Sequence, residues 1–222
     1  MGSAVAQVLP LAIGVVASPL PIIAVILILV GPSGRAKAMS FLAGWLAGIL
    51  VVGLIGVLLV NQASGSSSDG YSTAGRWARA IVGAALLVLA VQQWRGRPRA
   101  GDEPPQPKWM AALGGITPVR SAVLGITFAA IKPKNLLLTL AAAGAISETG
   151  IPLAQELVVL GVFTVVATLG IAAPVLVSFT MGDRADAVLQ GWGAWLTKHN
   201  AVVVAAVLVV IGVILLVQAA VG

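Results

Sequence analysis

The sequence predicts an all-α membrane protein whose six transmembrane helices form an inverted 3+3 repeat. Of its 222 residues, 59% are hydrophobic and only 9% are charged, and the mean hydropathy is +1.05. Soluble domains carry about 25% charged residues, so this composition excludes an ordinary soluble fold. Two further observations support the prediction: basic loops alternate with uncharged ones along the chain, and a proline-containing break interrupts the first helix of each half.

Six apolar segments are long enough to cross a bilayer as helices, because about 20 apolar residues span a hydrocarbon core of about 30 Å. A polar stretch over 181–199, which holds Trp192 and Trp195, is expected to be a loop or a short interfacial helix before the last span. We expect the six spans at about 4–30, 39–61, 76–94, 122–146, 153–179 and 201–221.

The basic residues predict the orientation, since cytoplasmic loops are enriched in Lys and Arg. The loops after the first, third and fifth spans are basic, whereas 62–75 and 147–152 contain no Lys or Arg. We therefore expect one multi-pass domain over 1–222 in the cytoplasmic membrane, with both termini extracytoplasmic. Arg76 and Arg79, at the outer end of the third span, are exceptions to the alternation.

Glycines in the second span are spaced for close helix contact, and two of them fit the small-xxx-small pattern. They permit a homodimer but do not require one, and glycine is also simply common in membrane helices. These residues are Gly44, Gly48, Gly53 and Gly56.

Each half of the chain opens with an apolar segment that proline interrupts near its middle. The halves, about 1–95 and 118–222, are joined by a basic loop over 95–120 that is expected to be cytoplasmic. Ser18-Pro19-Leu20-Pro21 interrupts the first, and Lys132-Pro133-Lys134-Asn135 interrupts the second. Proline lacks an N–H and disfavours the helical conformation in the residue before it. We therefore expect spans one and four to be discontinuous at 18–21 and 132–135.

Charge at the middle of a bilayer costs at least a few kcal/mol and marks a functional site by default. In inverted-repeat transporters, broken helices meet near the midplane and bind substrate there. Two alternatives remain open: the prolines are plain kinks in packing helices, or the lysines pair locally or reach an interface. The candidate substrate-binding residues are Ser18, Pro19, Pro21, Lys132, Pro133, Lys134 and Asn135.

These residues predict an anion site. Helix N-termini carry partial positive charge and free N–H groups, and two lysines add full charge, so a phosphate or carboxylate is favoured. Ser18 is expected to cap the second half of span one, and Asn135 to donate at the second break. We expect Lys134 to contact the substrate anion and Lys132 to pair with backbone carbonyls that the break frees.

The remaining polar inventory argues against other classes of protein. All seven acidic residues lie in loops or at span ends, so no carboxylate is expected at mid-membrane to bind Na⁺, a proton or a metal ion. The chain has no Cys and a single His, His199, which excludes a thiol relay and a histidine metal cluster. The spans hold no nucleophile–base–acid set, so we do not expect an enzyme. We also expect no cofactor and no nucleic-acid partner.

Three stretches resemble one family: ASPLPIIAVILIL in span one, FLAGWLAGILVVGL in span two and FAAIKPKNLLLTLAAAGAI in span four. They are similar to the actinobacterial glycopeptidolipid- and sulfolipid-addressing (GAP-like) proteins of the wider LysE-type exporter superfamily. The resemblance covers nearly the whole chain from about Ala17. In the amino-acid exporters of that superfamily the comparable blocks read more like PGP and NPK, where this chain has Pro19-Leu20-Pro21 and Lys132-Pro133-Lys134. The resemblance implies export of an envelope lipid or glycolipid.

Three functions fit these observations. We favour an exporter or flippase of an anionic lipid or glycolipid, with the head group bound near the proline breaks. The alternatives are a small-molecule exporter of the amino-acid type and a non-transporting accessory subunit of an envelope lipid-export machinery. A lateral opening between helices would favour the first, a closed aqueous vestibule the second, and a filled interior with a large apolar outer patch the third.

Overall fold

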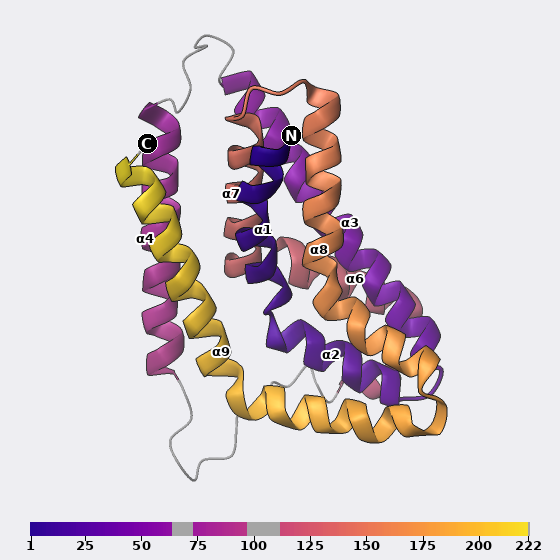
Figure 1. Ribbon diagram of the computed structural model, residues 1–222. Coiled ribbons are helices and arrows are strands. Elements are labelled where there is room, and N and C mark those ends of the chain that lie inside the picture. Colours follow the sequence, from indigo (N-terminus) through magenta and orange to yellow (C-terminus); the bar gives the residue numbers. More distant parts are fainter. Residues whose placement is uncertain (64–72, 97–111, 222) are drawn as a thin grey trace.

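The computed structural model describes residues 1–63, 73–96 and 112–221, which are helical apart from short connections. The loops expected over 62–75 and 95–120 lie largely outside these ranges. The helices, drawn in Figure 1, are α1 (Gly2–Val16), α2 (Pro19–Val30), α3 (Gly34–Ala63), α4 (Thr73–Arg95), α6 (Pro118–Ala130), α7 (Pro133–Ser147), α8 (Leu153–Thr180) and α9 (Ala185–Val221), with 3-10 turns η1 (Ala112–Gly115) and η2 (Gly182–Arg184).

Four of the described helices are long and apolar enough to cross a membrane alone: α3, α4, α8 and α9. The pairs α1/α2 and α6/α7 pass only when taken together, and they bend by 54° and 64° at their breaks. The described chain therefore has four to six candidate spans. α9 joins the expected interfacial stretch to the expected last span, and Figure 1 shows it bent, with its first part running across the lower end of the molecule.

Each helix break lies just before a proline. α1 ends at Val16 and α2 begins at Pro19, with Ser18 as the N-cap residue at a non-helical ψ of 85°. α6 ends at Ala130 and α7 begins at Pro133, with Lys132 as an extended N-cap residue. Proline is well placed at the first helical position, where its missing N–H would have no partner. The first break is thus narrower than the sequence predicts, and Pro21 lies inside the first turn of α2.

The glycines of α3 pack inside the chain. A Cβ at Gly44 would overlap the backbone of Ala122 in α6, and a Cβ at Gly125 would overlap the backbone of Phe41 in α3, so these two helices approach each other closely. Because these glycines contact helices of the same chain, a homodimer would have to form through another face of the protein. Farther along α3, Gly48, Gly53 and Gly56 face Ala129, Leu160 and Ala143, respectively.

Helices from the two halves pack against one another. α3 lies against α6, α4 against α9, and α1 against both α7 and α8. In Figure 1, α4 and the rising part of α9 stand side by side as one unit, beside the group that contains α1, α7 and α8. The N-terminus and the end of α9 lie at the same end of the bundle.

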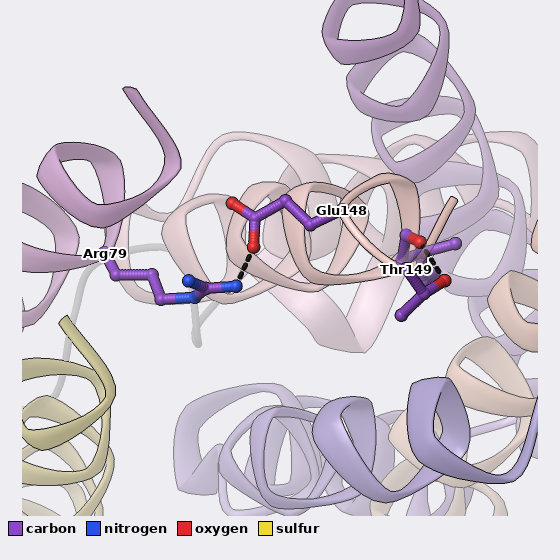
Figure 2. A network of polar contacts seen from close by, with 4 residues as sticks. Arg79, Glu148 and Thr149 are labelled. Atoms are coloured by element: carbon purple, nitrogen blue, oxygen red, sulfur yellow. Dashed lines mark hydrogen bonds and ion pairs between the residues drawn. The ribbon is translucent and has the colours of Figure 1, made fainter. Parts of the chain in front are cut away.

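The two arginines that break the alternation of basic loops have partners at this end. Arg79 of α4 forms an ion pair with Glu148, the residue that follows α7, and Figure 2 shows this pair reaching across between the two elements. Arg76 donates from Nε to the carbonyl of Ala219 near the end of α9, at 3.3 Å, where the helix dipole favours a cation. Both arginines therefore have a local role in packing.

Candidate functional site

The structure brings the two helix breaks together. Ser18 Oγ lies 3.0 Å from Asn135 Oδ1 and 2.7 Å from Lys134 Nζ, although these residues are more than 100 positions apart in sequence. Ser18 is 3% exposed and Asn135 is 1% exposed. The contact between the breaks is thus polar and buried.

Lys134 holds the end of α1. Its ammonium donates to the carbonyl oxygens of Gly14 at 2.7 Å and Ala17 at 2.9 Å, and to Ser18 Oγ at 2.7 Å. An ammonium has three N–H donors, so these acceptors use its full capacity. The charge also sits at the C-terminus of α1, where the helix dipole favours a cation. We expected this pairing with freed carbonyls for Lys132; that assignment was wrong, since Lys134 makes the bonds.

Ser18 and Asn135 likewise satisfy carbonyls at helix ends. Ser18 Oγ lies 2.7 Å from the carbonyl oxygen of Val15, which competes with Asn135 Oδ1 for its single proton. Its side chain makes no cap bond to α2, contrary to expectation. Asn135 Nδ2 donates to the carbonyl of Phe128 in α6 at 2.9 Å. Unpaired carbonyls at a buried helix end are costly, and these side chains remove that cost.

Lys132 has a different environment. Its Nζ lies 4.6 Å from the centre of the Phe128 ring, a cation–π contact. The side chain is half-buried, and within the described part of the chain no carbonyl or carboxylate accepts a hydrogen bond from its ammonium. Lys132 is therefore the lysine with hydrogen-bonding capacity left for a ligand.

A cavity of about 360 Å³ adjoins both breaks. Lys132 and Lys134 border it, and none of the acidic residues that the structure describes does. The residues at the starts of α2 and α7 also border it, and the geometry of a helix start leaves the amides of Leu20, Lys134 and Asn135 without intrahelical acceptors. The remaining wall comes from α4 and α9 and consists of Leu89, Gln92, Gln93, Asn200, Val204 and Leu208.

All seven residues predicted from the sequence border this cavity: Ser18, Pro19, Pro21, Lys132, Pro133, Lys134 and Asn135. The sequence reasoning did not include the amide side chains Gln92, Gln93 and Asn200. They carry no distinct signal in the sequence, because polar residues are ordinary at the ends of apolar segments. The Oδ1 atom of Asn200 is buried and has no hydrogen-bond partner among the described residues.

A buried acidic residue, Glu156, lies away from the cavity. Glu156, in the first turn of α8, is 2% exposed and accepts a hydrogen bond from Asn61 Nδ2 of α3 at 2.7 Å. It does not border the cavity. Among the residues that the structure describes, no group of three His, Cys, Asp or Glu side chains could hold a metal ion.

The chain is a multi-pass helical membrane protein in which the break between α1 and α2 and the break between α6 and α7 meet beside a cavity that two lysines border. The sequence model of the family described as Sap, sulfolipid-1-addressing protein, matches residues 8–220, and the chain belongs to this family. This confirms the resemblance to the sulfolipid-addressing proteins, while the link to the wider LysE-type superfamily stays a resemblance. Comparison with curated proteins and with solved structures finds no match.

Proposed function

We propose that this protein is a transporter that exports or flips an anionic lipid or glycolipid across the cytoplasmic membrane, with the head group held in the cavity at the helix breaks. One observation carries the proposal. Three protein acceptors use the donors of Lys134, whereas Lys132, within the described part of the chain, makes a cation–π contact and no hydrogen bond. A half-buried cation without an anionic partner among the described residues favours a ligand that brings the negative charge.

The donors around the cavity suit a phosphate or sulfate ester. Such a group has several acceptor oxygens and forms strong charge-assisted hydrogen bonds. Lys132, the free amides at the two helix starts and the side chains of Gln92 and Gln93 can supply donors from several directions. The family description names a sulfolipid, which is consistent with an anionic head group.

The proposed topology is six spans in an inverted 3+3 repeat, with α1/α2 and α6/α7 each forming one discontinuous span. One observation supports it: the first span of each half packs against the second span of the other half, α1 against α8 and α6 against α3, as a two-fold relation between the halves requires. The positions of the basic loops in the sequence support a topology with both termini outside. α1 and α7 have 15 residues each, which is about 22 Å of helix, so the cavity falls in the cytoplasmic half of a core about 30 Å thick.

Lipid transfer in reconstituted vesicles tests this proposal. The purified protein is placed in phosphatidylcholine vesicles that contain phosphatidic acid labelled on its acyl chain with a dithionite-sensitive fluorophore. We expect the protein to raise the fraction of phosphatidic acid that dithionite can bleach, with little effect on equally labelled phosphatidylcholine.

Two other outcomes would contradict the proposal. Uptake of free amino acids without lipid transfer would favour the small-molecule exporter. No transfer of either substrate, by protein shown to be folded and with a membrane potential imposed in either direction, would favour the accessory subunit.

A further inference from the structure

An apolar groove lies between α1 and α9 on the surface of the bundle. Its walls include Pro10, Ile13 and Gly14 from α1 and Val207, Val210 and Ile214 from α9. The groove has a volume of about 280 Å³, and every residue that borders it is apolar. Ile13 is 60% exposed and Val210 is 57% exposed, so the groove is open toward the surroundings of the bundle.

The groove and the polar cavity are neighbours along α9. On α9, Asn200, Val204 and Leu208 border the cavity, and the adjacent stripe from Ala206 to Ile214 continues as the groove. Positions three and four apart lie on one face of a helix, so the two surfaces overlap along α9 and follow each other in the direction of its C-terminus.

On α1, Gly14 lies between the groove and the cavity. Gly14 borders the groove, and its carbonyl accepts a hydrogen bond from Lys134, which borders the cavity. Ser18, at the cavity, lies one helical turn beyond Gly14. A polar cavity bordered by two lysines thus lies next to an apolar groove on the surface of the bundle.

We propose that this groove is the acyl-chain subsite of a lipid whose anionic head group occupies the cavity, which rests on the function proposed above. A head group in the cavity must leave its chain in an apolar environment, because burial of an alkyl chain in a polar compartment is unfavourable. The groove supplies that environment within one or two helical turns of the cationic site. The ligand is accordingly an anion that carries a hydrocarbon chain. A water-soluble anion with the same head group would occupy the cavity and leave the groove empty.

Photocrosslinking in lipid nanodiscs tests this inference. The nanodiscs contain phosphatidylcholine and a small fraction of phosphatidic acid with a diazirine on its acyl chain close to the glycerol. Irradiation, digestion and mass spectrometry then locate the crosslinks. We expect crosslinks on residues 10–14 and 206–214 that disappear with excess unlabelled phosphatidic acid but persist with excess phosphatidylcholine.

A matched pair of variants separates the groove from the remaining surface of α9. Val210→Trp places a large side chain in the groove, and we expect loss of the groove crosslinks. Val213→Trp changes an exposed residue, 46% accessible, that does not border the groove, so crosslinks should stay at the wild-type level. Equal loss in both variants would contradict the inference.

The failures of the two proposals are distinguishable. A second phosphatidic acid carries the diazirine on its head group. If it crosslinks near Lys132 while the chain probe labels the groove no more than other lipid-facing surfaces, the acyl-chain subsite is wrong and the transport proposal stands. If neither probe gives crosslinks that unlabelled phosphatidic acid can displace, both proposals fail.

Discussion

Lys134→Met should destabilise the protein far more than Lys132→Met. Methionine keeps much of the length of lysine and removes the charge and the donors. At position 134 it would leave the carbonyls of Gly14 and Ala17 and the hydroxyl of Ser18 without their donor. At position 132 it would remove a cation–π contact alone.

The two magnitudes can be bounded from these contacts. Hydrogen bonds between membrane helices average about 0.6 kcal/mol in double-mutant cycles, so three bonds give a lower bound of about 2 kcal/mol. Breaking a buried charged network by removing one member costs about 3–5 kcal/mol, which sets the upper bound for Lys134→Met. A partly exposed cation–π contact is worth about 0.5–1 kcal/mol, so the loss for Lys132→Met should stay within that range.

Unfolding in mixed micelles measures this difference. The fraction of SDS is raised and tryptophan fluorescence follows unfolding, with the fully buried Trp45 as a reporter in the core. We expect the unfolding midpoint to fall markedly for Lys134→Met and slightly for Lys132→Met. Equal midpoints for the two variants, or a larger loss for Lys132→Met, would refute the assignment of Lys134 as the residue that holds the end of α1.

Three further predictions follow from other parts of the fold. Gly44→Ile should prevent close packing of α3 on α6 at Ala122 and yield little folded protein, as judged by gel-filtration recovery; normal recovery would contradict that contact. Arg79→Met and Glu148→Gln should each destabilise the protein by about 3 kcal/mol in the same SDS titration, and the double variant should lose less than the sum, whereas strictly additive losses would show that the pair is not coupled. A periplasmic-type reporter fused after Gly222 should be active, and activity only of a cytoplasmic reporter would overturn the proposed topology.

The positions of the helix breaks could be predicted from the sequence because their cause is local. Pro19 and Pro133 each disfavour a helical conformation in the residue before them, and this effect needs no tertiary contact. The break before α2 was placed too far along because Pro21 also looked disruptive. Proline within the first turn of a helix costs no hydrogen bond, so Pro21 is accommodated there.

The roles of the two lysines could not be read from the sequence, because they depend on how α1 packs against α7. Lys132 and Lys134 lie within three residues of each other and have the same chemistry. Which one reaches the carbonyls of Gly14 and Ala17 is decided by the rotation of α7 about its axis, since residues two apart diverge by about 200°. Hydropathy and charge counts carry no information on that rotation.

The wall that α4 and α9 contribute to the cavity escaped prediction for a similar reason. Gln92, Gln93 and Asn200 lie at the ends of their apolar segments, where polar residues are ordinary. Only the packing of α4 and α9 as one unit beside the breaks brings them to the cavity. Arg79 did stand out in the sequence, because it is a basic residue at the end of a span where the loop pattern predicts none. Its ion pair with Glu148 explains the exception, and only the structure shows that pair.

The central claim is that Lys132 is the cation that meets the anionic head group, whereas Lys134 is structural. Its most direct test is the rate of phosphatidic acid transfer, per folded protein, for Lys132→Met and Lys132→Arg in the reconstituted vesicles. We predict near-complete loss for Lys132→Met and substantial retention for Lys132→Arg, with SDS unfolding midpoints close to that of the wild type for both. Transfer by Lys132→Met at the wild-type rate would contradict the claim.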